Sequence, residues 1–288
     1  MWRVLSETFR GFVEDECPRL AAALAYYTFF ALPALLVTIV YLGGLLVGQK
    51  AVEEQLTSHF EQTIGRAGAE RMIAILHGAS RPEQSWQGWI VGAGMLLLGA
   101  TGALQELQTA LNRAWRVKPD PRQGFLSGFF IKRLLSLALL LIIAMLLIAS
   151  LAVSWGLAAF GEWIDAHPSL GLSSQVIGWL HTGVSVMIIT TLLAAVLKFL
   201  PDARIKWSDV WLGAVATAVL FWLGQSVIGI YLAWSHPTSA FGAAGSLALV
   251  LLWMYYSAMI LFLGAEFTHA LAEHRGSLAQ PARGARRA

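Results

Sequence analysis

The chain has 288 residues, of which 57% are hydrophobic and 13% are charged, and its formal net charge is +3. Because a soluble domain carries about a quarter charged residues, this deficit along the whole chain excludes a soluble enzyme with one apolar patch. The single cysteine, Cys17, excludes an internal disulfide and a cysteine-based metal cluster.

Residues 1–17 have the pattern of an amphipathic helix. Apolar residues recur at steps of three and four and share one helical face: Trp2, Leu5, Phe9 and Phe12. Charged residues occupy another face: Arg3, Glu7, Arg10 and Glu14. The pattern predicts an interfacial helix on the cytoplasmic side of a membrane, and packing against a helix bundle is a compatible interpretation.

Six apolar segments predict an all-α, polytopic membrane protein with six transmembrane helices. They cover residues 20–47, 89–104, 134–160, 177–200, 210–234 and 246–270. As a helix, the first segment is about 42 Å long, whereas a hydrocarbon core is about 30 Å thick. We therefore expect this span to tilt or to bend, and Pro33 is the predicted bend.

The segments outside the spans complete the predicted organisation. Residues 49–88 are polar and helix-prone, and they predict a periplasmic helical loop between the first two spans. Residues 1–275 are expected to form a single six-span domain. Residues 276–288 are rich in Gly, Pro, Ala and Arg, which predicts a disordered basic tail.

The distribution of lysine and arginine predicts the orientation. Of the 20 lysines and arginines, sixteen lie on the side of the two termini and the other four lie in the loop 49–88. Because positive residues accumulate on the cytoplasmic side, we expect both termini to be cytoplasmic.

A polar stripe follows the second apolar segment. Polar side chains recur there at steps of four, three and four, beginning at Thr101. The candidates for binding a substrate or an ion in this region are Glu106, Gln105, Gln108, Asn112 and Arg113. The alternative interpretation is that the stripe only locks helices together through hydrogen bonds, each contributing about 1 kcal/mol.

A second candidate is Glu266, near the inner end of the last span. Gly264 and Ala265 precede it and would let another helix approach closely. Asp15 is expected at the same level, so the two carboxylates belong to a predicted ionic network at the inner mouth of the bundle. The arginines considered as partners of Glu266 are Arg113, Arg133 and Arg204. A purely structural clamp is the alternative.

Residues 239–246 (SAFGAAGS) join the last two spans with small, uncharged residues. With Gly242 and Gly245, this segment is a candidate re-entrant turn, which is allowed only where protein or water satisfies its backbone. An ordinary tight outer loop is the alternative.

The sequence lacks the patterns that catalysis would need. The seven histidines are scattered, and no metal-hydrolase, P-loop or serine-elbow motif occurs. We therefore expect no enzyme, no metal, no cofactor and no binding of nucleic acid.

Several segments together resemble the YihY/BrkB family of bacterial inner-membrane proteins. They are Asp15, residues 20–33 (LAAALAYYTFFALP), 102–117 (GALQELQTALNRAWRV), 200–213 (LPDARIKWSDVWLG) and 242–266 (GAAGSLALVLLWMYYSAMILFLGAE). One departure is Phe241, where many relatives have tyrosine. The resemblance implies six spans in one domain of the inner membrane. Some members were formerly labelled ribonuclease BN, but the clustered His and Asp ligands of such an enzyme are missing here.

The leading hypothesis from the sequence is a transporter or flippase-like protein for a lipid or another amphipathic envelope component. The alternative is a non-transporting scaffold for envelope integrity that docks a periplasmic partner through the first outer loop. The partners considered are membrane lipids, a periplasmic or membrane protein, and a second copy of the chain.

Overall fold

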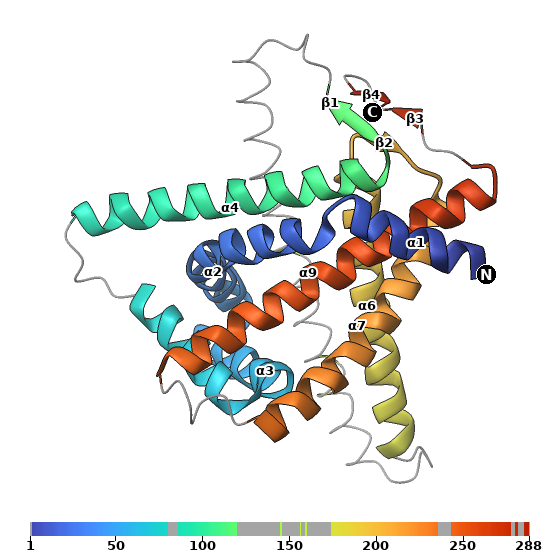
Figure 1. Ribbon diagram of the computed structural model, residues 1–288. Helices are drawn as coiled ribbons and strands as arrows, with labels where there is room; N and C mark the ends of the chain where they lie inside the picture. The colour runs from blue at the N-terminus through green and yellow to red at the C-terminus, as the bar shows by residue number, and fades with distance from the viewer. Residues whose placement is uncertain are drawn as a thin grey trace.

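The computed structural model describes residues 2–79, 86–119, 174–235, 243–277, 280–281 and 285–287, with the single residues 145, 156 and 159. These residues form long helices and short strands (Figure 1). The helices are α1 (Trp2–Glu14), α2 (Cys17–Val47), α3 (Gln49–Ala79), α4 (Trp86–Ala114), α6 (Ser174–Phe199), α7 (Trp207–Ser235) and α9 (Ala243–His274). The strands are β1 (Val117–Pro119), β2 (Ala203–Arg204), β3 (Gln280–Pro281) and β4 (Ala285–Arg287).

Five of the six apolar segments coincide with helices, namely α2, α4, α6, α7 and α9. The other one, residues 134–160, lies outside the described residues except at positions 145, 156 and 159. By length and hydropathy, Trp207–Gly224 of α7 and Leu247–His274 of α9 can each cross a membrane. The two bent halves of α2 together make a further candidate.

The helix α2 bends at the predicted position. Its segments Cys17–Pro33 and Leu35–Leu45 meet at an angle of 46°. Proline has no N–H to donate and its ring crowds the preceding helical turn, so a bend at Pro33 is the expected consequence.

The helix α2 also lies at the centre of the packing, because α3, α4 and α9 all contact it. Its closest neighbour is α4, whose Gly99 lies directly against the α2 backbone. A Cβ atom at Gly99 would come within 2.7 Å of the Ala31 nitrogen. Glycine is therefore required where these two helices cross.

The helices α7 and α9 pack through a reciprocal contact. Gly213 of α7 lies against the side chain of Thr268 on α9, and Gly264 of α9 lies against Thr217 on α7. Each threonine hydroxyl also donates to the carbonyl of the glycine four residues earlier, at 2.7 Å in α7 and 2.6 Å in α9. These bonds satisfy the hydroxyl groups inside the interface, where an unpaired polar group would be costly.

The segment between the first two spans forms a helix that turns back on itself. His77 contacts the carboxylate of Glu53, although a straight helix would separate them by about 36 Å. Val52 and Leu56 share one buried cluster with Met72 and Leu76, so the two halves of α3 pack side by side.

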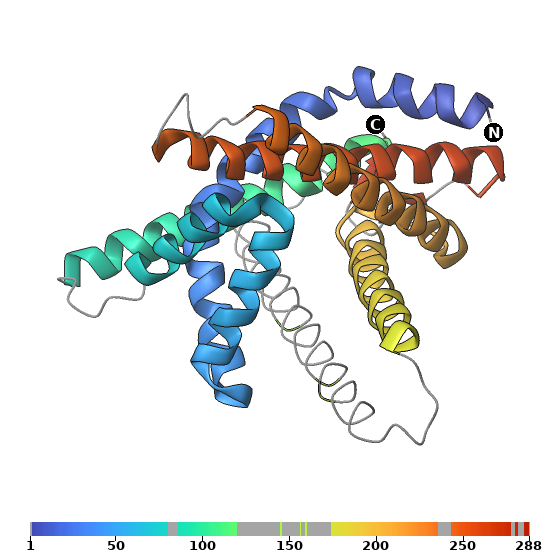
Figure 2. The ribbon, with the colours of Figure 1, turned by 90° about the horizontal axis from the view of Figure 1, so that it is seen from below.

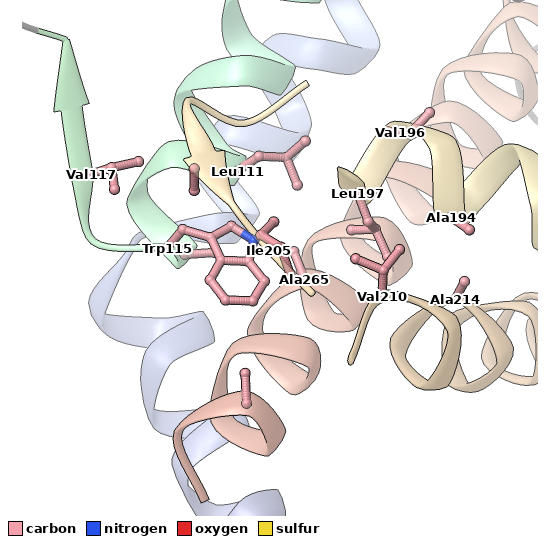
Figure 3. Packing of buried hydrophobic residues seen from close by; sticks show 13 residues of the cluster. Leu111, Trp115, Val117, Ala194, Val196, Leu197, Ile205, Val210, Ala214 and Ala265 are labelled. Carbon is pink, nitrogen blue, oxygen red and sulfur yellow. The ribbon is translucent and has the colours of Figure 1, made fainter. Parts of the chain in front are cut away.

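A cluster of buried apolar side chains joins the ends of four helices (Figure 3). Leu111 and Trp115 come from the end of α4 and its following turn, and Leu197, Val210 and Ala265 come from α6, α7 and α9. One member of the cluster, Ala265, directly precedes Glu266 in α9.

The C-terminal tail differs from the disorder that its composition predicts. β4 pairs with β1, and β3 pairs with β2, in two antiparallel ladders. The segments that follow α4 and α6 offer unpaired backbone groups, which the tail residues satisfy. Composition does not report such a tertiary partner, which the structure places beside residues 280–281 and 285–287.

Candidate functional site

The centre of the candidate site is Glu266, which lies on α9 and is 2% exposed. Its side chain faces Gly11 on α1. A Cβ atom at Gly11 would come within 3.1 Å of the Glu266 Cδ atom and would overlap one carboxylate oxygen. The absence of a side chain at Gly11 is therefore what lets α1 cover the carboxyl group.

Asp15 lies beside Glu266 and comes from the end of α1, where its N–H donates to the Gly11 carbonyl at 2.8 Å. The Asp15 and Glu266 carboxyl groups lie close enough to interact electrostatically. Asp15 Oδ2 is buried, and none of the described residues donates a hydrogen bond to it. Because ionised carboxylates offer only acceptors, a proton or another cation is needed to join the two groups.

The third member of this group is Cys17, in the first turn of α2. Its side chain is 1% exposed, and its Sγ atom lies 4.0 Å from Glu266 Oε1. A thiol is only a weak donor, so this contact leaves most of the hydrogen-bonding capacity of Glu266 unused. Asp15, Cys17 and Glu266, which we call the carboxyl site, thus meet where α1, α2 and α9 converge.

Arg113 does not pair with Glu266 as the sequence interpretation proposed. Its Nη1 atom contacts Glu16 Oε2 at 3.2 Å and donates to the Asp15 carbonyl at 3.4 Å. Arg19 pairs with the same Glu16 carboxylate. Hydrogen bonds from these two arginines lower the pKa of Glu16, and the bond from Arg19 contributes more than the bond from Arg113. Arg113 therefore holds the link between α1 and α2 in place beside the carboxyl site.

For the other two arginines that were proposed as partners, the described residues give no contact with Glu266 either. Arg204 is exposed in β2, and its backbone pairs with Gln280. Arg133 lies outside the described residues. Within the described ranges, no lysine or arginine lies within 4.0 Å of Glu266.

The polar stripe of α4 contacts the turn between α6 and α7. Asn112 Nδ2 donates to Asp202 Oδ2 at 2.9 Å, and the Asp202 N–H donates to Asn112 Oδ1 at 2.7 Å. Gln108 Nε2 donates to the other Asp202 oxygen at 3.3 Å. These bonds favour the interpretation that Gln108 and Asn112 lock helices together.

The remaining predicted residues lie elsewhere. Gln105 is exposed and Glu106 is half-buried on α4, and within the described residues no hydrogen bond or ion pair joins Glu106 to Glu266. Gly245 lies in the first turn of α9. Residues 239–242, which include Gly242, lie outside the described residues, and residues 243–246 form the start of α9.

A buried carboxylate that the sequence interpretation missed is Asp209, in the first turn of α7 and 1% exposed. Ser277 Oγ donates to it at 2.6 Å, and Arg275 Nη1 lies 3.7 Å from its other oxygen. Both partners follow α9, where Gly276 has a φ of 66° and ends the helix. The sequence feature that could have identified Asp209 is its place in the first turn of a predicted helix, where the helix dipole favours an acidic residue.

Within the described part of the chain, no three His, Cys, Asp or Glu side chains are placed to hold a metal ion.

Comparisons with known proteins identify a family that the chain matches. A family model described as virulence factor BrkB matches residues 8–288. A UPF0761 membrane protein of Saccharophagus degradans is 29% identical over 272 residues, which are 94% of this chain and 60% of the relative. Namesakes in Teredinibacter turnerae and Azotobacter vinelandii are 31% and 30% identical, over 93% and 95% of this chain and 60% and 64% of theirs. The chain thus spans about three fifths of the length of these relatives. No solved structure matches.

Proposed function

The chain belongs to the BrkB virulence-factor family of membrane proteins, and we propose that it is a flippase-like transporter of the bacterial inner membrane. Its cargo in this proposal is a lipid or another amphipathic component of the cell envelope. The proposal involves movement only and assigns no chemical step to the protein.

The proposal includes six spans with both termini in the cytoplasm. Five of the spans are α2, α4, α6, α7 and α9, and residues 134–160 supply the sixth. The bias of lysine and arginine toward the side of the termini supports this orientation. The helix α3 then lies on the periplasmic side.

The observation that carries the transport proposal is the burial of Glu266 beside Asp15, with no lysine or arginine within 4.0 Å in the described ranges and with Arg116 acting on it only from a longer distance. A carboxylate inside a membrane helix is costly unless it is paired or functional. In a structural ion pair, a lysine or arginine would lie beside Glu266. Here its neighbour is instead a second carboxyl group, that of Asp15. Such a pair can take up and release a cation, which a transporter needs and a scaffold does not.

The surroundings of the carboxyl site fit a binding site that opens. α1 covers Glu266 at Gly11, and α2 begins beside it and bends further along at Pro33. Arg113 holds the α1–α2 link through Glu16. In the proposal, a proton, a monovalent cation or a headgroup amine occupies the carboxyl site while the cargo moves.

The test is lipid movement in proteoliposomes that contain the purified protein. The Glu266→Gln variant keeps the size of the side chain and can donate to Asp15, so we expect it to fold. We expect its transport rate to fall by roughly tenfold or more. This corresponds to an increase of about 1.4 kcal/mol or more in the activation free energy of transport. Glu106→Gln is the matched control, because Glu106 is a half-buried glutamate of α4 outside the carboxyl site.

Each outcome of this assay is informative once thermal unfolding shows that the variants are folded. Movement that Glu266→Gln loses and Glu106→Gln retains supports transport through the carboxyl site. Equal movement in all three proteins removes Glu266 from the mechanism. No movement of any lipid class, beside a working control transporter, supports the envelope scaffold instead.

A further inference from the structure

The helix α1 has an apolar face that is exposed and that none of the described residues covers. The exposed fractions are 84% for Trp2, 42% for Leu5, 60% for Phe9 and 70% for Val13. These positions follow steps of three, four and four, so they form one stripe along the helix. We propose that this stripe is embedded in the interfacial layer of the lipid bilayer.

The opposite side of α1 already has a protein partner. Val4, Thr8 and Gly11 are buried, and α1 packs along α9 (Figure 2). Thr8 is satisfied internally, since its hydroxyl donates to the Val4 carbonyl at 2.7 Å. The packing against α9 therefore fixes the rotation of α1 and holds the apolar stripe outward.

The charged residues form a third face. At about 100° per residue, the buried, apolar and charged stripes lie roughly a third of a turn apart around the helix. The charged stripe is Arg3, Glu7, Arg10 and Glu14, all exposed. Arg10 and Glu14 pair at 2.7 Å within it. A helix that borders protein, lipid and water needs one face for each of them. The sequence analysis recognised the apolar and the charged face.

The position of α1 argues for lipid as the occupant of the apolar face. α1 ends at Glu14 and α2 begins at Cys17, so the apolar face starts within a few residues of a helix proposed to cross the membrane. Tryptophan and phenylalanine are favoured at the interfacial level of a bilayer. The face ends at Val13, next to the residues that form the carboxyl site, so lipid contact and the cover over Glu266 belong to one helix.

Spin labels on full-length protein in phosphatidylethanolamine–phosphatidylglycerol vesicles test this inference. The native Cys17 is 1% exposed, so the wild-type protein controls for background labelling. A label at Phe9→Cys should meet oxygen, which concentrates in lipid, more often than a water-soluble nickel complex. A label at Arg10→Cys, on the charged face, should show the reverse order.

The inference is overturned if the Phe9 label meets the nickel complex more often, because that places the face in water. It is also overturned if the label is broadened by a neighbouring label and sharpens on dilution with unlabelled protein, because a second copy then covers the face. Val13→Cys reads the same face independently and serves if Phe9→Cys does not fold. The readout does not depend on transport.

Discussion

At Asn112, one buried side chain both donates to and accepts from a single partner, Asp202. An Asn112→Asp change keeps the acceptor but replaces the donor with a second carboxylate. We expect this variant to lose about 2–3 kcal/mol of stability, the usual value of a hydrogen bond to a charged group. Unfolding of the detergent-solubilised protein measures the loss. Adding Asp202→Asn should restore much of it, because the swapped pair again has a donor and an acceptor.

The control for this prediction is Gln105→Glu, which introduces the same charge on the exposed side of α4. We expect it to change stability little, since exposed charges interact weakly. If Asn112→Asp kept full stability and lost transport, Asn112 would belong to the cargo path and its role as a helix lock would be wrong.

At the residue level, the sequence singled out two polar side chains that the structure buries, Asn112 and Glu266, but it did not predict the contacts they make. Asn112 and Glu266 were chosen because polar side chains in apolar helices are costly. Their partners Asp202 and Asp15 lie 90 and 251 positions away along the chain. The partner depends on the crossing of helices, which a single sequence does not encode locally. For Glu266, the sequence placed Asp15 at the same level but proposed an arginine as the partner, and it did not predict the contact with Cys17.

At the level of the elements, the reciprocal contact between α7 and α9 makes a prediction about close packing. A Cβ atom at Gly213 would come within 2.8 Å of the Thr268 Cβ and would overlap its hydroxyl. We expect Gly213→Ala to cost about 1–3 kcal/mol, the usual penalty for overpacking a core. Combining it with Thr268→Ala should recover part of that loss, and unfolding measurements on both variants show whether it does.

Gly183 provides the matched control, because it also lies in a helix but has open space around its Cβ position. Gly183→Ala should leave stability unchanged or raise it slightly, since alanine is the better helix former. Equal losses at Gly213 and Gly183 would show that the cost comes from the helix backbone and not from the contact with Thr268.

The elements also show which parts of the fold can be predicted from the local sequence pattern. The bounds of α2, α6, α7 and α9 follow from long apolar runs, and the bend at Pro33 follows from one residue. The fold-back of α3 and the strands of the tail depend instead on tertiary contacts. Similarly, periodicity identified the apolar face of α1 but placed Phe12 in it, whereas the structure packs Phe12 against the cluster around Cys17 and Phe262.

At the scale of the whole molecule, the proposed topology places α3 and the end of α9 on opposite sides of the membrane. Glu54 on α3 and Glu273 at the end of α9 are both exposed, so cysteines there should react with an impermeant maleimide wherever it reaches them. In spheroplasts, Glu54→Cys should be labelled at once and Glu273→Cys only after permeabilisation, because the positive residues hold the termini inside. Cys17 is buried, so the wild-type chain should stay unlabelled in both conditions. Labelling of both cysteines before permeabilisation would place α3 and the C-terminal side together, and the six-span arrangement would then have to be abandoned.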